Sequence, residues 1–275
     1  MFVSEDLAVN EKGHLTIGGV DTKEYGTPLY VMDEDLIRKH CRSFRSSIDC
    51  FYQGEGLACY ASKAFSCKEI YRIMKEEQMG VDVVSGGELY TAVQAGFDPA
   101  NICMHGNNKT TEELQMALDY KVGRIVVDNI YELKQLNQMA GAQHVTANIL
   151  FRIKPGVDAH THNFIRTGQI DSKFGFALET GEAFEAVKTA LQCEHLHLSG
   201  LHCHIGSQIL DTEGFVAAAE IMMQFYAKIK NELGVELHDL NLGGGFGIQY
   251  TEQDDPLPYE AYMEAVAKVI NRCSQ

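Results

Sequence analysis

The chain has 275 residues, and its 38 acidic and 23 basic side chains give a formal net charge of −15. This acidic balance argues against nucleic acid and anionic membrane surfaces as partners, because both select basic patches. No apolar run approaches the length needed to span a bilayer and the N-terminus has no apolar signal core, so we expect a cytoplasmic protein.

The first 56 residues differ in pattern from the rest of the chain. Two short apolar segments, His14–Gly19 and Pro28–Met32, are predicted to be strands that lie outside any βαβ unit. The segment Asp33–Ser47 follows and is predicted to be a helix, because its apolar residues recur three and four positions apart.

From residue 57 onward, short apolar runs alternate with helical patterns. The seven predicted strands are Leu57–Ala61, Val81–Val84, Ile102–His105, Arg124–Asp128, Asn148–Ile153, Leu198–His204 and Leu237–Leu242. Between them, apolar residues recur at helical spacing, as in the long stripe from Phe215 to Leu233. Strands that alternate with helices in this way predict a parallel sheet.

Three predicted helix starts show the capping-box pattern of a hydroxyl residue followed three positions later by glutamate. The pairs are Ser66 with Glu69, Ser85 with Glu88, and Thr110 with Glu113. Each pair lies just after a predicted strand, where a βα loop should lead into a helix. This agreement supports the register of the strand and helix assignment.

Two α/β architectures fit the alternation, an open doubly wound sheet and a closed (β/α)8 barrel. An open sheet normally has a glycine-rich turn after its first strand, whereas Ala61–Ala64 contains no glycine. The glycines Gly243–Gly245 instead follow the seventh strand, where barrels commonly bind phosphate. We therefore predict a TIM-type (β/α)8 barrel that is incomplete, because the sequence contains no eighth strand after the last helix, which ends near Arg272.

Polar residues at the carboxyl ends of barrel strands face the active site. Lys63 lies two residues past the first strand, where it is either a solvated surface lysine or a Schiff-base lysine. His202 and His204 share a face at the end of the sixth strand and could supply zinc ligands, which makes a metal-dependent hydrolase an alternative function. Because no further set of ligands completes such a site, we expect no metal.

Two glycine-containing segments offer backbone amides to an anion. Gly243–Gly245 place three consecutive amides without side chains directly after a strand, and a concave nest of this kind binds phosphate. Gly206 and Ser207 form a second donor cluster after the sixth strand. A lysine at the first strand and phosphate donors at the sixth and seventh predict a cavity for a phosphate-bearing aldehyde.

The segment Tyr60–Ala64 (YASKA) resembles the cofactor-lysine motif of the pyridoxal-phosphate decarboxylases with an alanine-racemase-like barrel. Within that group the chain resembles the diaminopimelate decarboxylase family. The other stretches that carry the resemblance are Val81–Leu89, His105–Lys109, Ile165–Gly168, Ser172–Gly175, Gly200–Gln208 and Gly243–Gly247. Ornithine and arginine decarboxylases share the lysine and the glycines, but they do not typically carry the loop His160–Gly175.

The resemblance implies decarboxylation of meso-2,6-diaminopimelate to L-lysine and carbon dioxide, the last step of lysine biosynthesis. Lys63 would hold pyridoxal 5′-phosphate as a Schiff base, and His204 would stack on its ring; both would be catalytic. The residues implied to bind the cofactor are Lys63, Asp82, His204, Ser207, Gly243, Gly244 and Gly245, and those implied for the substrate and a lid are His162 and Ser172.

The resemblance also sets expectations for what accompanies the barrel. Members of the family continue into an eighth strand with a Glu-Pro-Gly-Arg motif and then a β-rich domain, and they form homodimers. We therefore expect residues 1–32 to belong with that β domain, residues 33–275 to form a truncated cofactor-binding barrel, and this chain alone to have low or no activity. A non-catalytic cofactor-binding relative, or an ornithine- or arginine-type decarboxylase, remains the alternative.

Overall fold

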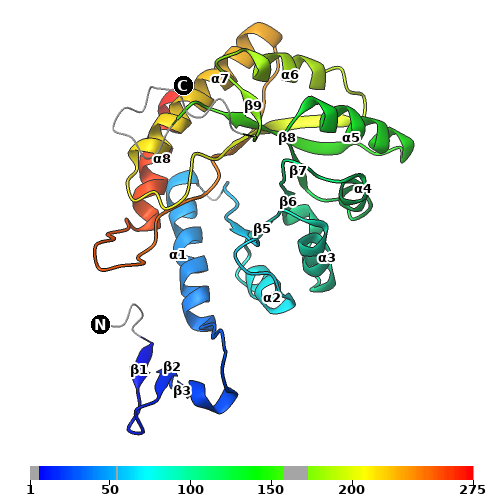
Figure 1. Ribbon diagram of the computed structural model, residues 1–275. Coiled ribbons are helices and arrows are strands. Elements are labelled where there is room, and N and C mark those ends of the chain that lie inside the picture. The colour runs from blue at the N-terminus through cyan, green and yellow to red at the C-terminus, as the bar shows by residue number, and fades with distance from the viewer. Residues whose placement is uncertain (1–5, 54, 158–172, 275) are drawn as a thin grey trace.

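A computed structural model describes residues 6–53, 55–157 and 173–274. Its centre is a curled sheet with helices on the outer face (Figure 1). The path through the sheet runs in the order β11 (Asp239–Asn241), β10 (Leu196–Cys203), β8 (Ala147–Lys154), β7 (Arg124–Val127), β6 (Ile102–Met104), β5 (Gly80–Val83) and β4 (Cys59–Ala61). All pairs in it are parallel, which confirms the predicted α/β barrel architecture.

The curled sheet forms part of a barrel without closing. Among the described residues, β4 and β11 end the path and do not pair with each other. A short additional strand, β9 (Phe176–Ala177), pairs with the end of β8 and was not expected from the sequence. Two residues are too few to produce a recognisable apolar alternation, so β9 has no signal of its own.

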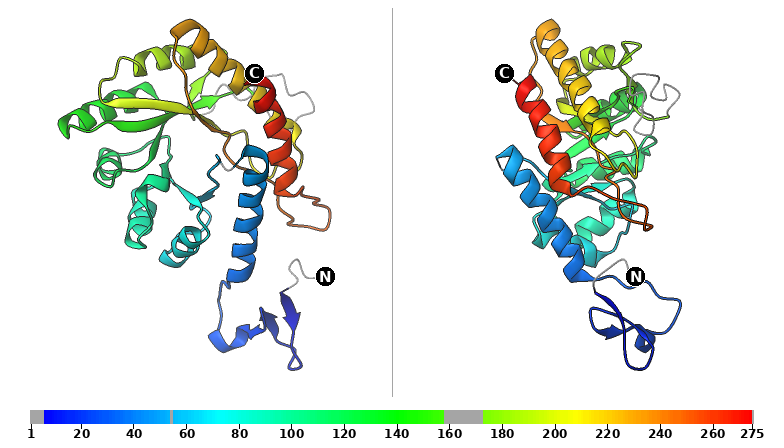
Figure 2. Two further views of the ribbon diagram at one scale, coloured as in Figure 1. Left: turned by 180° about the vertical axis from the view of Figure 1, so that it is seen from behind. Right: turned by 90° about the vertical axis from the view of Figure 1, so that its left-hand side faces the viewer.

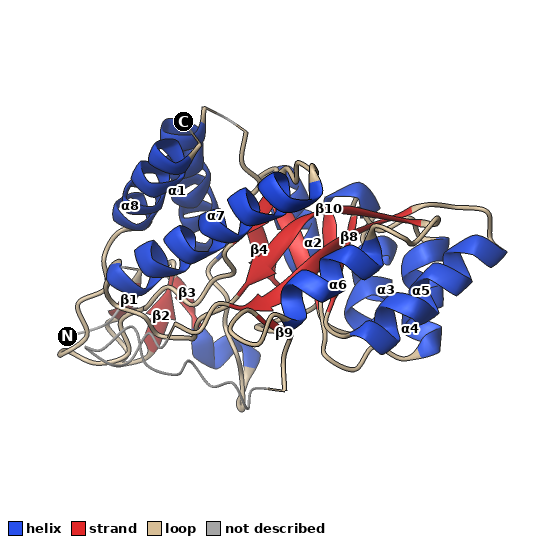
Figure 3. Cartoon of the chain, turned by 90° about the horizontal axis from the view of Figure 1, so that it is seen from above, coloured by secondary structure: helices blue, strands red, loops and turns tan. Residues whose placement is uncertain are grey.

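Helices follow the strands and cover the convex face of the sheet, as the view from above shows (Figure 3). Their bounds are α2 (Lys68–Glu76), α3 (Gly86–Gln94), α4 (Thr111–Asp119), α5 (Ile130–Ala142), α6 (Glu182–Ala190), α7 (Glu213–Leu233) and α8 (Tyr259–Cys273). The apolar stripe of α7 is buried as predicted, from Phe215 to Ile229. Among the described residues, no helix combines the length and the apolar character that a bilayer crossing requires.

The two faces of the sheet differ in chemistry because successive side chains of a strand point to opposite sides. Residues on the convex face, such as Val81, Val83 and Phe151, are fully buried in the main core with the helices. On the concave face, a small separate apolar cluster contains Cys103, Val126 and Leu150. By the alternation of side chains, Asp82 on β5 and Arg152 on β8 point to the same face. The concave face is therefore the one that can present chemistry.

Helix α1 (Glu34–Tyr52) connects the N-terminal segment to the barrel. It starts where the sequence predicts, since the carboxylate of Asp33 accepts a hydrogen bond of 3.0 Å from the amide of Leu36. Figure 2 shows α1 beside α8, and the hydroxyl of Tyr52 donates to the carbonyl of Met263 on α8 over 3.1 Å. The last helix of the chain thus packs against the first.

A small antiparallel sheet precedes α1 and lies at the end of this helix, away from the large sheet (Figures 1 and 2). Its strands are β1 (Leu7–Val9), β2 (Leu15–Ile17) and β3 (Val20–Asp21). The strand predicted at His14–Gly19 is therefore present, whereas the strand predicted at Pro28–Met32 was wrong. That segment pairs with no strand in the described chain, and Tyr30 is 94% exposed within it.

The three predicted capping boxes have different outcomes. Thr110 forms the complete box with Glu113. Ser85 caps α3 over 3.3 Å, but the carboxylate of Glu88 accepts from the amide of Val84 instead of completing the box. Ser66 does not cap α2, because that helix begins one residue later than predicted and the hydroxyl of Ser66 lies 2.9 Å from that of Tyr71.

Candidate functional site

Lys63 lies just past the carboxyl end of β4, at the rim of the concave face. The preceding residue, Ser62, is buried, and its amide donates to the carbonyl of Asp82 over 3.0 Å. The hydroxyl of Ser62 also donates to that carbonyl and lies 3.2 Å from the carboxylate of Glu88. These bonds anchor the turn to β5, so the exposed side chain of Lys63 starts from a fixed point of the backbone.

His204 follows β10 and lies on the same side of the sheet as His202. Burial, together with the neighbouring positive charges of Arg152 and Lys63, lowers the pKa of His204 to about 4. His202 is buried more deeply, and burial holds its pKa well below the usual range. Both rings are therefore neutral at neutral pH. The positive charge of Lys63 disfavours a proton on His204, so the predicted lysine and histidine lie near each other.

Asp82, His105 and His202 form the floor of the concave face. His105 Nε2 lies 3.3 Å from Asp82 Oδ1, and the rings of His105 and His202 meet edge to face with their centroids 4.8 Å apart. Asp82 Oδ1, His105 Nε2 and His202 Nδ1 are buried and have no hydrogen-bond partner among the described residues. Buried polar atoms of this kind are normally satisfied by a ligand or a water molecule.

The metal alternative does not fit the histidine pair on which it was based. In the described part of the chain, one group of three potential ligands occurs, and it comprises Asp82, Cys103 and His105. Neither His202 nor His204 belongs to it. The close contact between Asp82 and His105 is explained by the attraction between a carboxylate and an imidazole, and it requires no metal ion.

The glycine loop after β11 has a backbone conformation that favours glycine. Gly243 and Gly245 have φ values of 74° and 102°, a region that side chains other than glycine rarely enter. The carbonyl of Gly245 accepts from the amide of Ile209 over 2.9 Å, which ties this loop to the segment after β10. In the described structure the amides of Gly244 and Gly245 donate to no acceptor, so they remain able to bind an anion.

Ser207 is exposed beside this loop. A Cβ added at Gly245 would lie 3.3 Å from the Cα of Ser207, so the two predicted phosphate-binding segments are in contact. The structure thus brings Lys63, His204, Ser207 and the glycine loop to one rim, with Asp82 below them. His162 and Ser172, predicted for the substrate and the lid, lie outside the described residues.

Arg152 was not predicted as a site residue, although it lies on the concave face of β8. Its guanidinium is 4.1 Å from the centroid of the Phe174 ring and 3.9 Å from the carboxylate of Asp128. The other oxygen of Asp128 accepts from the amide of Gly175 over 3.0 Å. Arg152 lies two residues past Leu150, so both side chains point to the concave face, and this period-two position is the signal that could have identified Arg152.

A comparison with known families matches residues 34–275 to the pyridoxal-binding domain of pyridoxal-dependent decarboxylases. The diaminopimelate decarboxylase of Bacillus methanolicus is 49% identical over 276 residues, which cover 99% of this chain and 64% of the relative. That of Bacillus subtilis strain 168 is 48% identical, with 98% of this chain and 62% of the relative covered.

Solved structures agree with the sequence comparison. The diaminopimelate decarboxylase of M. jannaschii in complex with L-lysine superimposes with a TM-score of 0.91 at 35% identity, over 100% of this chain and 64% of that one. The chain therefore spans a little under two thirds of the length of the relatives that it matches.

Proposed function

The chain belongs to the pyridoxal-dependent decarboxylase family, and from this membership we propose that it forms the cofactor-binding part of a diaminopimelate decarboxylase. The proposed reaction removes the carboxylate at the D-centre of meso-2,6-diaminopimelate and yields L-lysine and carbon dioxide. The observation that carries the proposal is the meeting of Lys63, His204 and the glycine loop at one rim of the curled sheet.

The residues at this rim fit pyridoxal 5′-phosphate. The primary amine of Lys63 is exposed and can bond covalently to an aldehyde, and the free amides of Gly244 and Gly245 can bind a phosphate beside the hydroxyl of Ser207. His204 is a neutral ring between these groups, so it can stack on an aromatic cofactor without adding positive charge. Asp82 has a buried carboxylate oxygen without a hydrogen bond, which suits a further polar contact.

When bound, the cofactor supplies an electron-withdrawing ring that delocalises the electron pair left by the departing carbon dioxide. The residues of this chain supply orientation. Lys63 would hold the aldehyde end, the glycine loop would hold the phosphate end, and His204 would contact the ring. His202 is buried and His204 is half-buried, so their rings limit the access of water to the floor.

The domain division and the oligomer belong to the same proposal. Residues 1–32 would form a unit separate from residues 33–275, which is supported by the separate antiparallel sheet and by a family match that begins at residue 34. The whole protein would form a homodimer, as the family resemblance implies. The molar mass from light scattering after size-exclusion chromatography tests the dimer.

The attachment of the cofactor gives the sharpest test. The chain is mixed with pyridoxal 5′-phosphate and reduced with borohydride, and we expect the added mass on the peptide that contains Lys63. Lys63→Ala should lose both the label and the visible absorption band, whereas Lys68→Ala, at an exposed position nearby, should keep both. A label that persists in Lys63→Ala would contradict the proposal.

The substrate class is tested on the chain after it has bound pyridoxal 5′-phosphate. Addition of meso-diaminopimelate should change the visible spectrum at concentrations where L-ornithine and L-arginine do not. A response to ornithine or arginine instead would favour the alternative decarboxylases, and a response to no amino acid would favour a non-catalytic relative.

A further inference from the structure

Lys109 is a buried lysine in the motif His105–Lys109, to which the proposed function gives no role. Its side chain is 1% exposed, and its ammonium lies 2.7 Å from the carboxylate of Glu132, which is 5% exposed. The ammonium also donates to the carbonyls of Gly106 and Val126, over 2.8 and 2.6 Å. Burying a charged pair costs free energy that an apolar pair of similar size avoids, so the presence of this pair requires a reason.

The pair joins two loops at the rim of the concave face. Through Gly106, Lys109 holds the loop between β6 and α4, in which Gly106 has a φ of 129° that other residues rarely adopt. Through Glu132, it holds the loop between β7 and α5, since the second carboxylate oxygen accepts from the amide of Asp128 over 3.3 Å. One ammonium therefore sets the relative positions of two neighbouring strand ends.

His105 is the residue that this arrangement places in the site. It directly precedes Gly106, and its amide donates to the carbonyl of Val83 over 2.8 Å, which continues the pairing of β5 with β6. Its ring is buried between Asp82 and His202, with the 3.3 Å and 4.8 Å contacts described above. A shift of the Gly106 carbonyl would move this ring and, with it, both neighbours.

We propose that Lys109 is a positioning residue: paired with Glu132, it holds His105 in place and so fixes Asp82 and His202 beneath the bound cofactor. The inference rests on the proposed function, because the cofactor is what the floor would support. A lysine that only stabilises the fold differs from a positioning residue in one respect. If Lys109 had a purely structural role, apolar side chains could replace it and Glu132 without any effect on the site.

The test separates stability from positioning. Lys109→Met leaves the buried carboxylate of Glu132 without its partner, so this variant is expected to lose stability. In the double variant Lys109→Met/Glu132→Leu, two apolar residues of similar size replace the pair, and the thermal midpoint should return to near that of the wild type. We expect the double variant nevertheless to bind pyridoxal 5′-phosphate about tenfold more weakly, because the floor is displaced. Wild-type affinity in a stable double variant would overturn the proposal.

A matched control removes an ion pair of the same residue types from the surface. Glu185 and Lys188 lie 2.7 Å apart on α6, both exposed, and Glu185→Leu/Lys188→Met should leave cofactor affinity unchanged. An equal loss of affinity in this control would assign the effect to charge alone and would overturn the proposal.

A second measurement does not need the cofactor. The imidazole resonances of His105, assigned by their absence in His105→Gln, should shift in the double variant and stay in place in the α6 control. If the wild-type chain binds no cofactor, the proposed function fails, while this comparison still decides whether Lys109 positions His105. Unchanged His105 resonances in the double variant would overturn the inference.

Discussion

Arg124 on β7 and Asp239 on β11 form an ion pair of 2.7 Å across the concave face of the sheet. Two strands, β8 and β10, lie between them in the sheet order. On a flat sheet the two main chains would be about 14 Å apart, because neighbouring strands are spaced by about 4.8 Å. The contact therefore depends on the curl that turns this sheet into part of a barrel.

We predict that this pair stabilises the curled form. Asp239→Asn should lower the free energy of unfolding by about 1 kcal/mol, a modest value because both side chains are about one third exposed. Urea unfolding measures the change, and a double-mutant cycle with Arg124→Met should return a coupling free energy of similar size. Glu236→Gln, which removes an exposed ion pair with Lys230, is the control and should have no measurable effect. A cycle without coupling would show that the contact contributes nothing.

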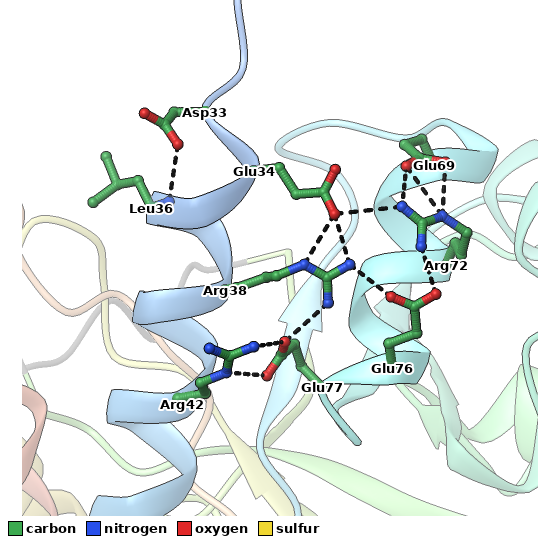
Figure 4. Close-up of polar contacts among 9 residues, drawn as sticks. All are labelled: Asp33, Glu34, Leu36, Arg38, Arg42, Glu69, Arg72, Glu76 and Glu77. Carbon is green, nitrogen blue, oxygen red and sulfur yellow. Dashed lines mark hydrogen bonds and ion pairs between the residues drawn. The ribbon is translucent and has the colours of Figure 1, made fainter. Parts of the chain in front are cut away.

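Glu77 and the arginines of α1 form the main polar contact between α1 and α2 (Figure 4). The carboxylate of Glu77 accepts hydrogen bonds from Arg42 over 2.6 and 2.8 Å and from Arg38 over 2.9 Å. Arg45 donates to the main-chain carbonyl of Glu77 over 2.9 Å. A negative charge at the carboxyl end of a helix is unfavourable for the helix dipole, so these cations are needed where α2 ends.

Replacing Glu77 by glutamine should destabilise the protein by about 2 kcal/mol, because charge-assisted hydrogen bonds in a buried position are lost. Chemical unfolding at neutral pH measures the change. The control is Glu69→Gln, since Glu69 is exposed on the same helix and, among the described residues, pairs with Arg72 alone; its unfolding midpoint should not change. Equal effects of the two substitutions would contradict the assignment.

The same residue predicts an acid dependence of stability. Hydrogen bonds from Arg42, with those from Arg38, lower the pKa of Glu77 to about 2 against an ordinary 4.5. A carboxyl whose pKa is lower in the folded state adds stability that is complete above pH 4.5 and disappears as the pH falls towards 2. Unfolding free energies measured across this interval should fall more steeply for the wild type than for Glu77→Gln. Parallel curves would contradict the prediction.

The sequence predicts most of the curled sheet because its strands are buried on the convex face and their apolar runs are visible in the sequence. All seven predicted strands are present, with bounds that shift by at most two residues. Pro28–Met32 has the same composition but no pairing partner in the described chain, and pairing is a property of the fold that a local pattern cannot show. The prediction that Ser66 caps α2 was wrong for a related reason. Its hydroxyl contacts that of Tyr71, and the capping pattern in the sequence does not show this contact.

The site divides in a similar way. Lys63, His204 and the glycine loop were predictable because each follows a strand and carries a residue type with a specific chemistry. His105 and Arg152 were missed, since their importance comes from neighbours elsewhere in the chain: Asp82 and His202, on other strands, for His105, and Phe174, in the segment before β9, for Arg152. Contacts across a sheet depend on strand order and curl, which a single sequence does not display.

His204 also predicts a loss of stability in acid, although it is a base and Glu77 is an acid. Because burial and the charges of Arg152 and Lys63 lower its pKa to about 4, the folded protein stays unprotonated there between pH 6.5 and 4 while the unfolded chain takes up a proton. This group therefore makes stability fall as the pH falls through that interval. Arg152→Met should raise the His204 midpoint in an NMR titration, because a neighbouring positive charge is removed. A midpoint near 6.5 in the wild type would contradict the assignment.

Gly245 and Gly244 provide a matched pair for the anion-binding loop. A Cβ at Gly245 would lie 2.0 Å from the carbonyl oxygen of Gly206, and its φ of 102° is unfavourable for alanine, whereas a Cβ at Gly244 meets nothing within 4 Å. Gly245→Ala should therefore lower the free energy of unfolding by more than about 1 kcal/mol and weaken the binding of pyridoxal 5′-phosphate, because the loop must move away from Ser207. Gly244→Ala keeps its amide and should keep both properties. Urea unfolding and a spectroscopic cofactor titration measure the two effects, and a Gly245→Ala protein as stable as the wild type would show that the loop adopts another conformation.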